Sequence, residues 1–173
     1  MSTTKDISFR LLDEHLTKWM ADHSILFLRI ALGIVFFWFG FLKFFPNLSS
    51  AENLAARTIH NLTGGLIESH TSIIILAIWE CLIGLGLVSG KFMRITLALL
   101  FLQMPGTILP LFFFPEETFL HFPYSPTLEG QYIIKNLVLI AAGIAIGATV
   151  RGGAVVADPE IAEAAKQEEE ENI

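Results

Sequence analysis

The stretch that decides the fold is Ser24–Lys43, SILFLRIALGIVFFWFGFLK, in which Arg29 is the only charge before the closing lysine. A helix needs about 20 mainly apolar residues to cross the roughly 30 Å hydrocarbon core of a bilayer, and this stretch has that length. It begins after 23 polar or mixed residues and is followed by no small-x-small cleavage site, unlike a signal peptide. We therefore interpret it as a retained membrane-spanning helix.

Three further stretches have the length and composition of a membrane span. The 173-residue chain is 53% hydrophobic and only 16% charged, whereas a soluble domain usually carries about 25% charged residues. Buried helices of a soluble protein would need a polar surface that this chain cannot supply. The sequence therefore predicts an all-α fold, an integral membrane four-helix bundle over residues 24–150, with spans at 24–43, 72–89, 92–114 and 132–150.

The net charge of −6 comes from the C-terminal segment, residues 151–173. Between Asp158 and Glu171 there are seven acidic residues and one lysine, so the rest of the chain carries ten acidic and ten basic residues. We expect an acidic cytoplasmic tail, either a frayed helix or a disordered segment. The balanced body also argues against nucleic acid as a partner, because phosphate binding needs a basic surface.

The segment before the first span, residues 1–23, has the pattern of an amphipathic helix. Its apolar residues recur at helical spacing, at Ile7, Leu11, Leu12, Leu16, Trp19 and Met20. We predict that this helix lies in the membrane interface with Trp19 as an aromatic anchor. The alternative is that it packs on the bundle.

Two segments on the opposite side of the membrane have signals of their own. A short outer-loop helix, closed by a Gly-Gly pair, is predicted by the spacing of Leu54, Ile59 and Leu62. In the third span Pro105 and Pro110 flank Gly106, which predicts a kink or break in that helix. The aromatic and proline-rich loop that follows predicts a cap at the outer interface.

Basic residues are divided unevenly between the two sides of the predicted bundle, and the side rich in Lys and Arg usually faces the cytoplasm. The side that holds both termini carries eight of them, Lys5, Arg10, Lys18, Arg29, Lys91, Arg94, Arg151 and Lys166. The opposite side carries three, Lys43, Arg57 and Lys135. We therefore predict that both termini are cytoplasmic.

Charged residues inside the spans are candidates for function, because an unpaired charge at the bilayer centre costs about 2.5–3.5 kcal/mol. Counted from the cytoplasmic end at about 1.5 Å per residue, Arg29 is roughly 8 Å deep and Glu80 roughly 14 Å deep. An arginine side chain covers that gap, so we predict an Arg29–Glu80 pair inside the bundle. The alternative is that Arg29 extends to the headgroups and Glu80 is protonated.

Further polar residues predict a small polar pocket that opens towards the outer leaflet. One face of the first span carries a stripe at steps of four and three residues, formed by Arg29, Gly33, Phe36, Gly40 and Lys43. The candidate ligand-binding or intramembrane polar residues are Arg29, Lys43, Glu80, Gln103, Lys135 and Asn136. For Gln103 and Asn136, a role in helix packing is the plainer alternative.

The single cysteine, Cys81, limits the redox chemistry of the chain. It excludes an internal disulfide, a CxxC pair, a haem attachment motif and Cys-ligated iron–sulfur or structural zinc sites. The five histidines do not pair at i, i+3 or i, i+4 spacing, so we predict no metal site. No catalytic residue can be assigned, and any electron transfer needs a carrier from elsewhere.

Two stretches carry a resemblance to a known group, RIALGIVFFWFGFLKFF at residues 29–45 and WECLIGLGLVSGKFMRIT at residues 79–96. They resemble the DoxX-like membrane proteins, which have four helices, a first span ending in Gly-x-x-Lys, and a second span with Glu before a Gly-rich end. The matching residues are Arg29, Gly33, Gly40, Lys43, Glu80, Gly84 and Gly86. Residues 37–45 and 128–143 are most similar to the inner-membrane subfamily that includes a bacterial reactive-chlorine resistance protein.

The resemblance implies a bacterial inner (plasma) membrane location, with the lipid bilayer as the surroundings. Some relatives are thiosulfate-to-quinone oxidoreductase components, and others are stress or accessory membrane proteins. We expect an accessory, non-enzymatic protein that binds a small lipophilic molecule such as a quinone, with a role in redox or envelope stress. The alternatives are a subunit of a quinone-linked oxidoreductase, acting with a partner subunit, and a small proton-coupled transporter that uses Glu80.

Overall fold

Long helices form most of the chain. The computed structural model describes residues 3–46, 48–49 and 52–171. Within these residues four helical segments are long and apolar enough to cross a membrane, Leu11–Leu42, Ser69–Ser89, Met93–Phe113 and Leu128–Ala148. The predicted all-α membrane bundle with four spans is therefore confirmed.

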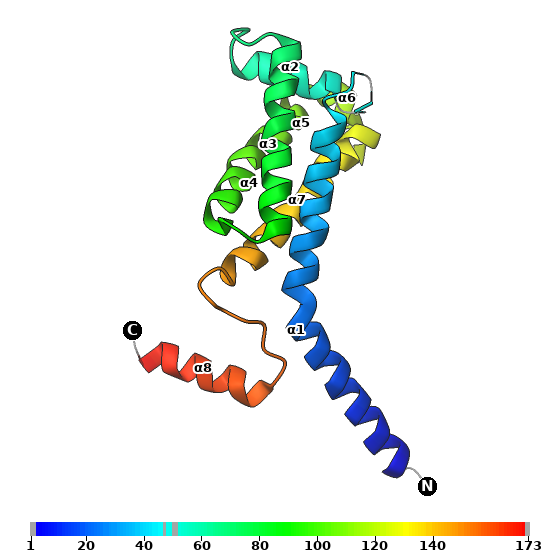
Figure 1. The fold of residues 1–173 in the computed structure, drawn as a ribbon. Helices are drawn as coiled ribbons and strands as arrows, with labels where there is room; N and C mark the ends of the chain where they lie inside the picture. The colour runs from blue at the N-terminus through cyan, green and yellow to red at the C-terminus, as the bar shows by residue number, and fades with distance from the viewer. Residues whose placement is uncertain (1–2, 47, 50–51, 172–173) are drawn as a thin grey trace.

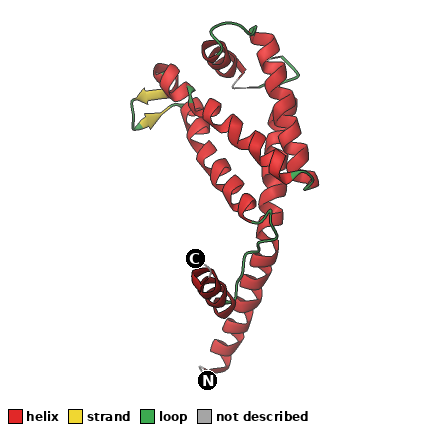
Figure 2. Ribbon diagram, turned by 90° about the vertical axis from the view of Figure 1, so that its left-hand side faces the viewer, coloured by secondary structure: helices red, strands yellow, loops and turns green. Residues whose placement is uncertain are grey.

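The elements follow one another as antiparallel spans with small structures between them on one side (Figure 1). In chain order they are α1 (Thr3–Leu42), α2 (Glu52–Leu62), α3 (Ser69–Ser89), α4 (Met93–Ile108), α5 (Pro110–Phe113), α6 (Pro115–Thr118), β1 (Phe119–His121), β2 (Ser125–Pro126), α7 (Leu128–Ala148) and α8 (Pro159–Glu171). The short outer-loop helix is α2, as predicted. The acidic tail forms α8, which lies away from the bundle at the end where α1 begins (Figures 1 and 2).

The first helix, α1, is longer than predicted. It runs without a break from Thr3 to Leu42, about 60 Å at 1.5 Å per residue, so the helix boundary predicted at Ser24 is absent. Its N-terminal half projects beyond the bundle (Figures 1 and 2). The apolar side chains there are exposed, Leu11 by 62% and Trp19 by 49%. The alternative that this segment packs on the bundle is therefore wrong, and its position in the membrane interface stays a prediction.

The proline-rich part of the third span breaks at one proline and not at the other. Pro105 lies inside α4 without ending it, whereas Leu109 separates α4 from α5, which begins at Pro110. Proline is well suited to the first position of a helix, where its missing N–H needs no partner. The outer loop that follows forms α6 and a two-stranded antiparallel hairpin, β1 and β2, which the sequence analysis did not predict (Figure 2).

The fourth span starts at Leu128, four residues before the predicted boundary at residue 132. The Thr127 hydroxyl caps this helix by accepting a hydrogen bond from the Gly130 N–H at 3.2 Å. A threonine in this position satisfies one of the free N–H groups of the first turn. The helix therefore begins four residues before the apolar stretch that hydropathy identifies, and it includes the polar residues Glu129 and Gln131.

The core lies where α1, α3, α4 and α7 meet. It consists of buried apolar residues from all four helices, Leu32, Phe36, Ile83, Leu87, Leu97, Leu100, Met104, Ala142 and Ile146. The indole N–H of Trp79 on α3 also donates to the Leu99 carbonyl on α4 at 3.1 Å. Lipid tails cannot accept a hydrogen bond from this N–H group. The bond to Leu99 therefore helps to fix the position of α3 against α4.

Glycines bring α1 and α3 into backbone contact. A Cβ atom added to Gly84 would lie 2.5 Å from the Phe37 nitrogen, and one added to Gly40 would lie 2.7 Å from Glu80 Cβ. Gly33 faces the carbonyl oxygen of Gly84 in the same way. Small residues at a helix interface allow this close approach, and here they set the relative height of the two helices.

We expect Gly84→Ala to destabilise the protein by about 1–3 kcal/mol, because the new methyl group meets backbone atoms of α1 that cannot move independently. The measurement is the thermal unfolding midpoint in detergent. Gly147→Ala is the matched control, since its Cβ would meet only Leu97 Cδ1, at 3.7 Å. That variant should be neutral or up to about 1 kcal/mol more stable. Equal effects of the two substitutions would contradict the assigned α1–α3 contact.

Candidate functional site inside the bundle

Three polar side chains from three helices meet inside the bundle. Lys43 follows the last residue of α1, Glu80 lies near the middle of α3, and Gln103 lies near the middle of the third span. Lys43 and Glu80 are each only 8% exposed. We call these three residues the polar triad, and all three are among the residues that the sequence predicts for the site.

The carboxylate of Glu80 is the centre of the triad. Its Oε2 accepts from the Lys43 ammonium at 2.6 Å, and its Oε1 accepts from the Gln103 amide nitrogen at 2.9 Å. Lys43 also donates to the carbonyl oxygen of Phe39 at 3.3 Å. An ionised carboxylate accepts hydrogen bonds on both oxygens, so each oxygen of Glu80 has a partner that compensates for its burial.

The triad leaves hydrogen-bonding capacity unused. The Gln103 Oε1 atom is buried and has no hydrogen-bond partner among the residues that the structure describes. The Lys43 ammonium has three N–H donors, of which two are accounted for by Glu80 and Phe39. A buried acceptor without a partner costs about 1–3 kcal/mol, which makes it a place where a further hydroxyl or N–H group is favoured.

The predicted Arg29–Glu80 pair is wrong, because Glu80 pairs with Lys43. The predicted depths place the start of the first span, Ser24, at the same height as the end of the second, Ser89. In the structure Gly40, not Arg29, packs beside Glu80. Arg29 is 11 residues before Gly40, about 16 Å along α1, and it lies against Gly90 at the opposite end of the bundle.

The two predicted site residues of the fourth span are not part of the triad. Lys135 is exposed, with its ammonium 5.3 Å from the centre of the Tyr132 ring. Asn136 is half-buried and makes no hydrogen bond with any residue that the structure describes. The predicted polar pocket bounded by Lys43 and Lys135 is therefore not formed as one group of contacts.

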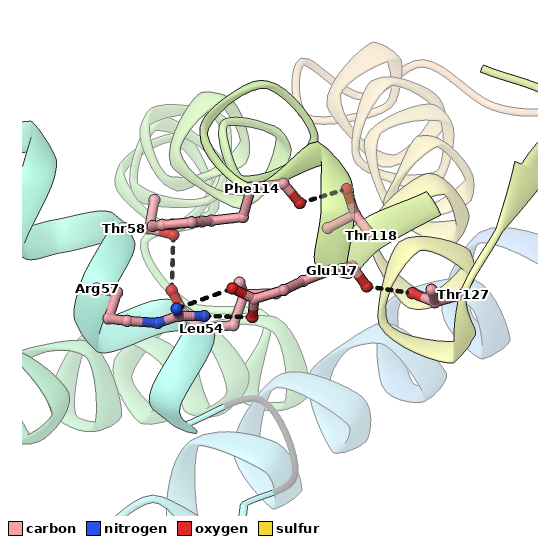
Figure 3. A network of polar contacts seen from close by, with 7 residues as sticks. All are labelled: Leu54, Arg57, Thr58, Phe114, Glu117, Thr118 and Thr127. Atoms are coloured by element: carbon pink, nitrogen blue, oxygen red, sulfur yellow. Dashed lines mark hydrogen bonds and ion pairs between the residues drawn. The ribbon is translucent and has the colours of Figure 1, made fainter. Parts of the chain in front are cut away.

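An ion pair that the sequence analysis missed joins two connections on the outer side. Arg57 on α2 forms a bidentate ion pair with Glu117 on α6, in which Nη1 donates to Oε1 at 2.8 Å and Nη2 donates to Oε2 (Figure 3). The guanidinium carbon also lies 4.5 Å from the centre of the Phe114 ring. These residues are 60 positions apart in the sequence, so no local pattern predicts their contact.

Hydrogen bonds of threonines hold the rest of this outer cap together (Figure 3). The Thr127 hydroxyl donates to the Glu117 carbonyl at 2.7 Å, and its N–H donates to the Thr118 carbonyl at 2.9 Å. Thr118 is fully buried and donates to the Phe114 carbonyl. The start of α7 is thereby tied to α6, and through Arg57 to α2.

Metal ligands do not converge in the part of the chain that the structure describes. No group of three or more His, Cys, Asp or Glu side chains there could hold a metal ion. Cys81 is partly exposed, and its sulfur lies 3.9 Å from the Phe37 carbonyl oxygen.

The sequence model of the DoxX family matches residues 24–115. The chain belongs to the DoxX family. The match begins in α1 and ends after α5, so it includes all three residues of the polar triad and leaves out α7 and α8. No curated protein and no solved structure matches the chain. This DoxX protein is a multi-pass membrane protein, and its family membership alone assigns no ligand.

Breaking the Lys43–Glu80 pair from either side should destabilise this DoxX protein by about 3–5 kcal/mol, because each single change leaves a buried charge without its partner. We expect Lys43→Met and Glu80→Gln to do so individually, and the double variant to lose less than the sum. Thermal unfolding in detergent measures all three. Lys135→Met is the control and should change stability by no more than about 0.5 kcal/mol. Additive effects would show that the pair contributes no coupling.

The outer ion pair should make stability depend on pH. Hydrogen bonds from Arg57 lower the pKa of Glu117 below its ordinary value of 4.5. Because the folded-state pKa is depressed, the stabilisation is complete above pH 4.5 and is lost as the pH falls through the lowered pKa.

The measurement is the difference in unfolding midpoint between the wild type and Glu117→Gln. We expect that difference to shrink as the pH falls below 4.5. Glu116→Gln, which changes the exposed neighbouring carboxylate, supplies the control. A difference that stays constant across this pH range would contradict the assigned pair.

Proposed function

We propose that this DoxX protein is an accessory membrane protein that binds a small lipophilic molecule of the quinone class at the polar triad, without catalysing a reaction of its own. The observation that carries the proposal is the buried Gln103 Oε1 atom, which lies next to a buried ion pair and has no hydrogen-bond partner in the described part of the chain. Burial of this acceptor without a hydrogen bond costs free energy, and a ligand that donates a hydrogen bond to it removes that cost.

The unused groups of the triad match the two forms of a quinone. The free N–H of Lys43 donates to a carbonyl oxygen, and Gln103 Oε1 accepts from a hydroxyl group. A quinone carries carbonyl oxygens and a quinol carries hydroxyl groups, on a ring that is otherwise apolar. A ligand pocket of this kind needs only a few polar groups to orient an apolar molecule.

The position of the triad favours a ligand that arrives from the bilayer. Glu80 lies 11 residues after Ser69 and 9 before Ser89, so it is near the centre of α3. Gln103 is ten residues from each end of the span Met93–Phe113. Groups at this depth are reached through hydrocarbon, which selects against water-soluble ligands.

Space for a ligand exists on the same face of α4 as Gln103. Gly106 follows Gln103 by three residues, which places both on one side of the helix. Apart from its chain neighbours and the backbone of its own helix, a Cβ atom added to Gly106 would meet no described atom within 4 Å. We infer that a ring bound at Gln103 lies over Gly106.

A role in redox or envelope stress follows from this binding as part of the same proposal. The sequence has no disulfide pair or haem attachment motif, so a quinone held by this chain would be stored, delivered or presented to a partner. An oxidoreductase subunit would need that partner to supply electrons. A proton-coupled transporter would instead use Glu80 as its proton carrier.

Binding of a short-chain benzoquinone to the purified protein in detergent tests the proposal, measured by native mass spectrometry. We expect saturable binding to the wild type and a loss of about tenfold or more in Gln103→Leu, the size expected for one hydrogen bond. Gly106→Leu should weaken binding as much, because it fills the space beside Gln103 and leaves the triad unchanged.

Lys135→Gln is the control for this experiment and should bind the quinone like the wild type. Unfolding midpoints measured without ligand separate lost binding from lost folding. Wild-type protein that fails to bind the quinone saturably, or variants that all bind equally, would overturn the proposal. Proton flux into vesicles that depends on Glu80, without quinone binding, would support the transporter instead.

A further inference from the structure

A groove opens at the end of the bundle opposite the outer cap. It has a volume of about 720 Å³ and is formed by α1, the turn between α3 and α4, the start of α4 and the end of α7. Two arginines, Arg29 and Arg94, contribute to its wall. The remaining lining is mainly apolar, with Ile25, Leu26, Phe92, Ile95, Ile146 and Val150.

The two arginines bring positive charge that no acid in the described part of the chain neutralises. Neither Arg29 nor Arg94 makes an ion pair with a described carboxylate. The nearest acidic residue on α1 is Asp22, which is exposed and seven residues before Arg29. The groove is therefore an electropositive site with apolar walls.

The Arg29 guanidinium lies against the backbone of the turn between α3 and α4. Gly90 has a positive φ of 70°, and a Cβ atom there would collide with Nη1 of Arg29. The lack of a side chain lets the guanidinium lie directly on this turn. Phe92 also has a positive φ, 54°, and precedes α4, whose first turn has no side-chain cap. The free N–H groups of that turn add to the positive field.

We propose that this groove binds the headgroup of an anionic phospholipid from the leaflet on the side of the two termini. Arg29 and Arg94 pair with the phosphate oxygens, for which the guanidinium fork is well suited. The apolar walls contact the upper part of an acyl chain. This site is separate from the polar triad and does not depend on the function proposed for it.

The apolar walls favour a lipid over free phosphate as the occupant. Ile25 and Leu26 on α1 and Ile146 on α7 border the same groove as the two arginines. A soluble anion would leave these side chains without contacts, whereas a lipid satisfies the charged and the apolar parts together. Basic pockets between membrane helices bind anionic lipid headgroups by the same combination.

Native mass spectrometry of the full chain in detergent tests the site, with dioleoylphosphatidylglycerol as the anionic probe and dioleoylphosphatidylcholine as the zwitterionic one. We expect the wild type to bind the anionic lipid at least about tenfold more tightly. In the double variant Arg29→Gln/Arg94→Gln the affinity for the anionic lipid should fall by about tenfold or more, while that for the zwitterionic lipid is unchanged. Two lost charge-assisted contacts account for a change of this size.

Lys18→Gln/Lys135→Gln is the matched control, since it removes two positive charges that lie outside the groove. It should keep the preference of the wild type. The double variant Arg29→Lys/Arg94→Lys retains the charge and should keep part of the affinity. Circular dichroism spectra and unfolding midpoints show whether each variant is folded.

Three results would overturn the proposal. The first is that Arg29→Gln/Arg94→Gln binds the anionic lipid like the wild type while folded. The second is that the matched control loses as much affinity, which would indicate a general effect of charge. The third is that inorganic phosphate displaces the lipid at equal concentration, which would assign the two arginines to a soluble anion.

Discussion

Backbone contact between α1 and α3 is the constraint on which the rest of the structure depends. Because Gly40 and Gly84 present no side chains, the two helices meet at a fixed height and distance. That height places Lys43 beside Glu80 and leaves Arg29 at the far end of the bundle. A larger residue at either glycine would separate the helices and draw the ammonium away from the carboxylate.

The bilayer explains why the charges in the spans are placed so differently. Near the centre of the spans a charge must find its partner within the protein, and Glu80 has two, Lys43 and Gln103. Near the end of the bundle a guanidinium reaches polar surroundings directly, and Arg29 has no protein partner among the described residues. Pairing inside the bundle and partial exposure at its end are two solutions to the same desolvation cost.

The sequence was sufficient to predict the spans because their signal is local. Length and hydropathy identify Ser69–Ser89 and the other three spanning segments without any knowledge of their packing. The residues of the triad could be named for the same reason, since polar side chains in such spans are rare. Pairing depends on the relative height of two helices, which only the glycine contacts determine, so Glu80 was assigned the wrong partner.

Other features lay beyond any pattern along the chain. The Arg57–Glu117 pair joins α2 to α6, which are separated in the sequence by two membrane spans, and the sequence does not indicate which charged loop residues pair with each other. The early start of α7 depends on the Thr127 hydroxyl, a capping effect that hydropathy does not register. The continuity of α1 differs from these two features, because the absence of proline between Thr3 and Leu42 can be seen in the sequence itself.

That continuity gives α1 a mechanical property. Arg29 lies on this uninterrupted helix and Lys43 directly follows its last residue, 14 residues and about 21 Å further along, so a movement of the helix as a whole displaces both. A rotation of the helix that moves the ammonium relative to Glu80 must swing the guanidinium relative to Gly90 by the same angle.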